Sequence, residues 1–390
     1  MKRRQTLSRL ILFLVCGLWL SNDNLAAQQR SNPVVSPEVK EDKSVIFRLY
    51  APEVKTVKVV GTFMDPIANI EMIKNDTGLF ELEVGPLPSD MYVYTYIVDG
   101  VKMLDPNNNV VVRDGSYIES RLMIPGEWVD NVIGVRDVPH GNVTAVWYPS
   151  PTTGMKRRML IYTPPGYEKS TESYPVLYLL HGGGGDEEAW ISRGKTNYIL
   201  DNLIADGKAK AMIIVITNGI ASVPAAPGER PLMLTSTRVS SPGAMTSGKF
   251  EESLVKDVIP FIESNYRVQT DPDHRAIAGF SMGGYQTQKI TNTNPGKFMY
   301  IGVMSMGLYN MFGQYNKEEH IAQIRKLKAS NPKLYYIGCG KTDFLFKGVT
   351  DLRALYDELG FKYTYRESEG GHSWNNWRLY LAEIAQLLFK

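Results

Sequence analysis

The residues around Ser281 form a pattern that places a serine hydroxyl where it can act as a nucleophile. The stretch "GFSMG" at residues 279–283 matches G-x-S-x-G. The apolar run "RAIAGF" precedes the serine, and "MGGYQTQKITN" after it can begin a helix. The pattern therefore predicts a buried strand, a tight turn that carries Ser281, and a helix whose N-terminus stabilises negative charge. A serine in such a turn needs a base that takes its proton.

The base can be sought by elimination, because the chain has only 5 histidines. Three of them lie in the expected linker, before the nucleophile strand, or on an amphipathic helix: His140, His274 and His320. His181 ends a strand at the right edge of the sheet, but it opens a glycine run and is expected to shape that loop. His372 follows the last predicted strand, in "EGGHSW". It is the predicted general base.

The base in turn needs a carboxylate to orient it. "LYYIGCGKTDFL" predicts a strand followed by a turn that holds Asp343, at the same edge of the sheet as Ser281 and His372. The order serine, aspartate, histidine is the one that the α/β-hydrolase fold uses. The competing acids lie along a helix or close to the histidine in sequence: Asp351, Asp357, Glu367 and Glu369. The last two are the main alternative to Asp343.

An oxyanion that forms at the serine needs hydrogen-bond donors. One expected donor is the backbone N–H of Met282, directly after the serine. The second should come from a loop after an early strand, and "LLHGGGGD" at residues 179–186 fits this role. The backbone N–H of Gly183 is the expected second donor. The alternative is that the four glycines only form a flexible turn.

The elements that would position these residues lie in two parts of the chain with different sequence patterns. Residues 28–122 contain short alternating β runs and predict a small β-sandwich. Residues 123–142 are expected to be a linker. From 143 to 390, continuous apolar strands alternate with helical patterns, which predicts an α/β domain with a doubly wound, mostly parallel sheet. Residues 220–248 form a Pro/Gly/Ser/Thr-rich loop, expected either as a lid or as a disordered segment.

The N-terminus and the composition limit location and partners. A basic start, an apolar run and "NLAAQQ" predict a signal peptide at residues 1–27, and therefore export to the periplasm or the exterior without stable membrane insertion. A lipoprotein signal at Cys16 is the alternative. The net charge of +2 and the lack of a basic stripe argue against nucleic acid. No motif predicts a metal or any other cofactor. Without residues 1–27, Cys339 is the only cysteine, which excludes a disulfide within the mature chain.

Several linked motifs occur in order from about residue 140 onward: "YLLHGGGG", "FEESLVKDVIPFIESNYRV", "AIAGFSMGG", "YYIGCGKTDF" and "EGGHSWNNWR". This set resembles the bacterial esterase family that contains feruloyl, acetyl xylan and enterochelin esterases. It is most similar to the feruloyl branch of carbohydrate esterase family one. The N-terminal "VIFRLYAPEVKTVKVVGTF" looks like the early-set, immunoglobulin-like sandwich of carbohydrate-binding module family forty-eight. The resemblance implies an α/β-hydrolase domain with Ser281, Asp343 and His372 as its triad.

The resemblance also implies a substrate, a feruloylated or acetylated xylan-type polysaccharide. An aromatic acyl group needs an aromatic-lined pocket, and four residues near the motif loops could supply it or could equally be core: Trp190, Phe344, Trp374 and Trp377. The leading hypothesis is a secreted serine esterase that releases feruloyl groups through an acyl-enzyme. The alternatives are an acetyl xylan esterase, a siderophore esterase of the enterochelin type, and a non-catalytic glycan-binding protein.

Overall fold

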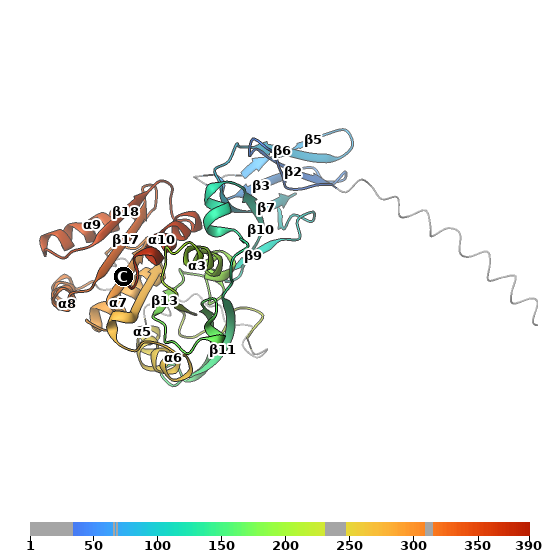
Figure 1. Ribbon diagram of the computed structural model, residues 1–390. Coiled ribbons are helices and arrows are strands. Elements are labelled where there is room, and N and C mark those ends of the chain that lie inside the picture. The colour runs from blue at the N-terminus through green and yellow to red at the C-terminus, as the bar shows by residue number, and fades with distance from the viewer. Residues whose placement is uncertain (1–33, 65–66, 68, 231–246, 309–314) are drawn as a thin grey trace, which may run out of the picture.

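The structure is a computed structural model that describes residues 34–64, 67, 69–230, 247–308 and 315–390. The predicted signal peptide lies outside the described residues, and so does most of the predicted lid. Two regions are seen in Figure 1, an N-terminal β region in blue and cyan and a larger region coloured green to red. In the described residues, no helix combines the length and the apolar character needed to cross a membrane.

The N-terminal region (residues 34–124) is all β. Its strands are β1 (Glu38–Val39), β2 (Val45–Tyr50), β3 (Val57–Gly61), β4 (Asn69–Glu71), β5 (Ile73–Lys74), β6 (Leu79–Val84), β7 (Asp90–Val98), β8 (Val101–Met103), β9 (Val111–Asp114) and β10 (Tyr117–Ile124). Within the described residues they form a four-stranded sheet, β1-β2-β6-β5, and a six-stranded sheet, β4-β3-β7-β10-β9, in which β8 pairs with β7. All pairs are antiparallel.

The core of this region follows from the alternation along its strands. In β2, Val45, Phe47 and Leu49 are buried, while the residues between them are more exposed. Tyr94 and Tyr96 of β7 are fully buried, and both hydroxyl groups donate to Asp105. These two tyrosines therefore pack in the core and offer no exposed stacking surface to a sugar ring.

The segment between the two regions is packed rather than free. It contains a π-helical turn, η1 (Val129–Ile133), whose two end residues are buried among side chains of the larger region. The amide of Asn202 donates to the carbonyl oxygens of Val132 and Gly134, at 2.8 and 2.9 Å. The linker is therefore held against the larger region by both apolar and polar contacts.

The C-terminal region (residues 142–390) is built on one sheet. Its strands are β11 (Asn142–Ser150), β12 (Met155–Thr163), β13 (Val176–Leu180), β14 (Ile213–Thr217), β15 (Arg275–Phe280), β16 (Tyr300–Met304), β17 (Leu334–Gly340) and β18 (Thr364–Ser368). The order of these eight described strands is β11-β12-β14-β13-β15-β16-β17-β18. The first two neighbouring pairs are antiparallel and the rest are parallel. This is the mostly parallel sheet that the strand and helix alternation predicts.

Helices cover both faces of this sheet. They are α2 (Ala189–Ser192), α3 (Thr196–Ala205), α5 (Lys249–Ser253), α6 (Ile259–Asn265), α7 (Met282–Thr293), α8 (Lys317–Ala329), α9 (Phe346–Glu358) and α10 (Trp374–Leu387), with short turns η2 (Tyr167–Lys169), η4 (Leu254–Val258) and η5 (Pro272–His274). Side chains of α5 to α9 share one core, and those of α2, α3 and α10 share the other. Burial on both faces explains why these strands are continuously apolar. The parallel strands all end at one edge, where the predicted site residues follow β13, β15, β17 and β18.

Candidate active site

Ser281 occupies the sharp turn between β15 and α7. Its φ and ψ are 54° and −119°, a conformation that L-residues rarely adopt. The turn is held on both sides, because the Ser281 N–H donates to the carbonyl of Met304 and the Ser281 carbonyl accepts from the N–H of Tyr285, each at 2.9 Å. Backbone strain of this kind persists only where the surroundings enforce it. The serine thus stands between strand and helix, as the G-x-S-x-G pattern predicts.

His372 and Asp343 are brought together from the ends of β18 and β17. His372 Nδ1 lies 3.0 and 2.9 Å from the two carboxylate oxygens of Asp343. The Asp343 side chain is buried, and its Oδ1 also accepts from the N–H of Leu345 at 2.8 Å. With Nδ1 donating to Asp343, the neutral imidazole keeps Nε2 as a proton acceptor.

The surroundings of Asp343 favour its ionised form. Burial raises the pKa of this carboxyl, but the hydrogen bond to His372 and the charge of His372 both lower it. The N–H of Leu345 and the hydroxyl of Ser305 add further hydrogen bonds, so that the pKa lies below its ordinary value. The carboxylate is therefore charged at neutral pH, as an orienting partner of a histidine should be.

The competing acids lie in other contacts. Glu369 is largely exposed and pairs with Lys341, while Glu367 accepts from the hydroxyl of Tyr365. Asp351 pairs with Lys347 on the surface of α9, and Asp357 accepts from the hydroxyl of Tyr363. Of the acids considered from the sequence, Asp343 is the one that hydrogen-bonds to His372.

Two residues connect the serine turn to the histidine: Trp377, which the sequence suggested as a pocket or core residue, and Ser305, to which the sequence gave no role. The ring of Phe280, directly before Ser281, stacks on Trp377 with centroids 3.8 Å apart. The same indole meets the His372 ring edge to face at 5.0 Å. Trp377 Nε1 donates to Ser305 Oγ at 3.0 Å, and Ser305 also hydrogen-bonds to Asp343. The end of strand β16, where Ser305 follows Met304, was the sequence signal that could have indicated it.

The Gly loop (residues 181–186) lies directly beside the N-terminus of α7. A Cβ atom on Gly283 would stand 2.6 Å from the carbonyl oxygen of His181, so only glycine allows this approach. His181 is fully buried; its Nδ1 lies 2.8 Å from the Gly182 carbonyl, and its Nε2 accepts from the N–H of Gly219 at 2.8 Å. Because a carbonyl only accepts, Nδ1 carries the proton. His181 thus holds its own loop, as expected.

The two expected oxyanion donors lie at this junction. Met282 is the first residue of α7, and its side chain is buried with Ile220 and Val223 from the start of the long loop after β14. Gly183 is exposed within the Gly loop. The backbone groups at the start of a helix have no partner inside the helix, so an anion at this position would be favoured.

The aromatic residues expected near the substrate divide into two kinds. Trp190 has no exposed surface, donates from Nε1 to the carbonyl of Leu180 and is a core residue, which corrects its assignment as a substrate contact. Phe344, in contrast, is 73% exposed, and its ring lies 4.5 Å from that of His372. Trp374 is mostly buried, and its Nε1 donates to Asp114 of the N-terminal region.

A cleft of about 610 Å³ lies between the two regions and opens beside His372. Its walls include Met91 and Tyr117 from the β region and Trp374 and Asn375 from the start of α10. This volume is within the range of ligand sites for small molecules. Within the described residues, no group of three or more His, Cys, Asp or Glu side chains is arranged to hold a metal ion.

Comparisons with known proteins bear on the family and the fold of this chain. Residues 34–114 match the family described as "Carbohydrate-binding module 48 (Isoamylase N-terminal domain)". An endo-1,4-beta-xylanase/feruloyl esterase of Xylanibacter ruminicola is 32% identical over 363 residues, which are 91% of this chain and 46% of that protein. The chain therefore spans less than half the length of this relative.

Solved structures share the fold. A ferulic acid esterase of Anaeromyces mucronatus covers 67% of this chain and 95% of its own, with 23% identity and a TM-score of 0.55. The enterobactin esterase of Shigella flexneri covers 88% of this chain and 92% of its own, with 16% identity and a TM-score of 0.64. These likenesses confirm an α/β-hydrolase-like fold preceded by an all-β region.

The remaining comparison concerns the family itself. Residues 150–388, more than half of the chain, match the family described as "Putative esterase". The expectation of a carboxylic ester hydrolase is thereby confirmed at the level of the family. This chain belongs to that esterase family.

Proposed function

We propose that this protein is a serine carboxylesterase that releases hydroxycinnamoyl groups, above all feruloyl groups, from plant cell-wall polysaccharide such as arabinoxylan. The observation that carries the proposal is the pairing of His372 with buried Asp343, linked through the ring of Trp377 to the strained turn of Ser281. The substrate class rests on the relative of Xylanibacter ruminicola, which is named for xylanase and feruloyl esterase activities.

In the proposed acylation step, Ser281 Oγ attacks the ester carbonyl carbon while its proton moves to His372 Nε2. The carbonyl oxygen becomes an oxyanion, which accepts hydrogen bonds from the N–H groups of Met282 and Gly183. The ester C–O bond then breaks, and His372 gives its proton to the departing sugar hydroxyl. Asp343 holds the imidazole in the required tautomer and stabilises its positive charge.

In the proposed deacylation step, water attacks the acyl-enzyme from the position that the sugar has left. His372 takes one proton from the water, the oxyanion forms again at the same donors, and the bond to Ser281 Oγ breaks. The proton returns to Ser281 and the free acid leaves. The same three side chains therefore serve both halves of the reaction.

The surroundings of the proposed nucleophile suggest how an aromatic ester would bind. Phe344 presents an exposed ring beside His372 and can stack on an aromatic or sugar ring. The cleft that His372 helps to line has room for part of a polysaccharide chain. We assign the described start of the long loop, with Ile220 and Val223 packed on Met282, to the acyl side.

The proposal includes two further features. Residues 1–27 direct export to the periplasm or the exterior, where plant polysaccharide is met. The two sheets of the N-terminal region form an immunoglobulin-like sandwich of the early-set kind. The groups that react with the ester or stabilise its oxyanion all lie in the larger region, so glycan binding by the sandwich would be an additional property.

The test is ferulate release from methyl ferulate and from feruloylated arabinoxylan by the purified protein, beside its Ser281→Ala variant. We expect release by the wild type and its loss in the variant. Release of acetate from acetylated xylan, without ferulate release, would keep the serine chemistry and withdraw the feruloyl assignment. Equal hydrolysis by both proteins would contradict the proposed function altogether.

A further inference from the structure

The turn between β9 and β10 of the N-terminal region reaches the catalytic edge of the larger region. At its tip, Gly115 has a φ of 60°, and a Cβ atom there would stand only 1.8 Å from the carbonyl oxygen of Gly184. The backbone of this turn therefore rests on the Gly loop with no space between them. Figure 1 shows the same relation, with β9 and β10 at the side of the β region that faces the larger region.

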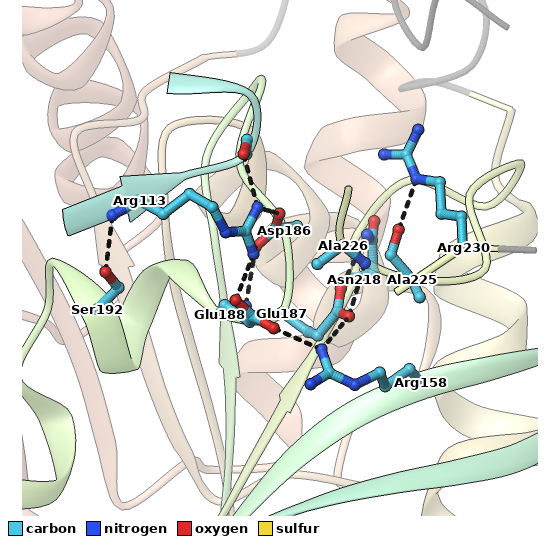
Figure 2. Close-up of polar contacts among 11 residues, drawn as sticks. Arg113, Arg158, Asp186, Glu187, Glu188, Ser192, Asn218, Ala225, Ala226 and Arg230 are labelled. Carbon is cyan, nitrogen blue, oxygen red and sulfur yellow. Dashed lines mark hydrogen bonds and ion pairs between the residues drawn. The ribbon is translucent and has the colours of Figure 1, made fainter. Parts of the chain in front are cut away.

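Arg113, two residues before Gly115, binds the end of the Gly loop. Its Nη1 lies 2.7 Å and its Nη2 3.3 Å from the two carboxylate oxygens of Asp186, whose side chain is buried. Its Nη2 also donates to Glu188. Figure 2 shows the guanidinium lying between these two acids. The backbone N–H of Arg113 donates to Ser192 Oγ at 2.8 Å. A bidentate contact of this kind fixes the orientation of the Asp186 carboxylate as well as its distance from Arg113.

The acidic segment that ends the Gly loop, residues 186–188, is also held by contacts within the larger region. Arg158 on β12 contacts Glu187 at 3.0 Å and Glu188 at 2.7 Å. Glu187 in turn accepts from the amide of Asn218 and from the N–H of Ala226. Figure 2 shows this chain of contacts running from Arg113 to the loop after β14. The Gly loop therefore ends in a segment whose position depends on charges from both regions.

The next residue, Asp114, contacts two loops at once. Its Oδ2 accepts a hydrogen bond of 2.8 Å from Nε1 of Trp374, which lies two residues after His372 in the sequence. Its Oδ1 faces Gly185, where a Cβ atom would approach it to 2.8 Å. One carboxylate of the N-terminal region thus lies between the Gly loop and the segment that carries the proposed base.

We propose that the β9–β10 turn is a structural part of the catalytic centre, with Arg113 and Asp114 as positioning residues. Arg113 sets the Gly loop through Asp186, and Asp114 sets the spacing between that loop and the His372 segment through Trp374. The N-terminal region then contributes to turnover even of esters too small to touch it. This inference rests on the proposed ester hydrolysis, and it assigns the region a role other than carbohydrate binding.

The experiment measures kcat and KM for p-nitrophenyl acetate, with the melting temperature of each variant. In Arg113→Gln and Asp114→Ala we expect kcat to fall about tenfold or more, because displaced oxyanion donors lose much of a stabilisation worth about a hundredfold or more per donor. KM should stay within about twofold, since only the transition state is affected. Asp114→Asn, which keeps an acceptor for Trp374, should restore most of the activity.

The matched control is Glu119→Gln, which removes another ion pair between the two regions. Glu119 on β10 pairs with Arg193 at 2.7 Å, outside the Gly loop. Glu119 lines the cleft that His372 also lines, but its ion pair is with Arg193 and not with the Gly loop or Trp374. This variant should lose stability while its kcat for the small ester stays within about twofold of the wild type. Equal falls of kcat in Glu119→Gln and Arg113→Gln would overturn the inference, because loss of stability alone would then explain them.

Further outcomes separate the positioning role from the proposed function. If Arg113→Gln does not fold, Arg113→Lys decides, because lysine keeps the charge without the planar fork. An unchanged kcat in that variant, or in Asp114→Ala, overturns the inference. Hydrolysis that survives in Ser281→Ala refutes the proposed function instead, whereas loss in Ser281→Ala with wild-type kcat in the turn variants refutes only the positioning role.

Discussion

Gly279 and Gly283, the two glycines of the serine motif, pack directly against each other. A Cβ atom on Gly279 would lie 2.5 Å from the carbonyl oxygen of Gly283. The reason is geometric: the chain reverses between β15 and α7, so the end of the strand and the first turn of the helix are in contact. The spacing of the motif is thus a packing requirement as well as a signature of chemistry.

Gly283→Ala should therefore damage both stability and activity. The added methyl group meets backbone oxygen atoms at 2.6 and 2.7 Å, which cannot move without shifting β13 or α7. We expect a loss of about 1–3 kcal/mol in the free energy of unfolding, together with a lower kcat. Urea denaturation and ester hydrolysis check both.

The control for this variant is Gly348→Ala in α9. There the nearest atom to an added Cβ lies 3.8 Å away, an ordinary contact. Alanine also suits a helix better than glycine, by up to about 1 kcal/mol. Stability should be kept or raised and activity kept. Equal behaviour of the two variants would show that the close approach at Gly283 is not limiting.

The strain at Ser281 predicts that stability and activity separate there. Ser281→Gly places the residue that tolerates a positive φ at 54°, so it should be more stable than Ser281→Ala by about 1 kcal/mol, after allowing for the greater chain entropy of glycine. Both variants should lose ester hydrolysis. Thermal unfolding of the two proteins provides the comparison, and a less stable glycine variant would mean that the turn stores no strain.

Asp343→Asn should lower kcat by about a thousandfold or more, because an amide cannot hold the imidazole in the required tautomer or stabilise its charge. KM should change little. Glu369→Gln is the matched control, since Glu369 is largely exposed and pairs with Lys341. Kinetics on one small ester are enough; a larger effect of the glutamate variant would transfer the orienting role to it.

His320 on α8 should make the folded state sensitive to mild acid. Burial lowers the pKa of its imidazole from 6.5 to about 4, and the nearby charge of Lys289 adds to this effect. Because the folded pKa is the lower one, the unfolded chain takes up the proton first as the pH falls. The folded state therefore keeps its full stability above the unfolded pKa and loses stability as the pH drops toward 4.

The measurement is the free energy of unfolding at pH 7 and at about pH 5, for the wild type and for His320→Gln. Each unit of pKa difference corresponds to about 1.4 kcal/mol, so the wild type should lose about 2 kcal/mol more than the variant over this interval. The glutamine does not titrate and serves as its own control for the other groups. Parallel losses would assign the acid sensitivity to carboxylates elsewhere.

Much of the site could be predicted because its residues follow strand ends. In a parallel sheet the carboxyl ends share one edge, so a serine after β15, an aspartate after β17 and a histidine after β18 are gathered there by topology alone. Asp343 could not be separated from Glu367 and Glu369 in this way, since all three lie within a few residues before or after a strand end at that edge. Direct contact with His372 distinguishes Asp343, and sequence spacing does not reveal such a contact.

The sequence by itself determined the local elements: the alternating strands of the β region, the apolar strands of the larger sheet, and the glycines of the serine turn. These follow from periodicity and from backbone sterics, which act between near neighbours in the chain. Only the tertiary structure decided that Trp190 is core, that the linker packs on α3, and that Asp114 meets Trp374, 260 residues away. Such contacts join residues that lie far apart in the chain and depend on the shapes of the packed surfaces, which the periodicity of the sequence does not reveal.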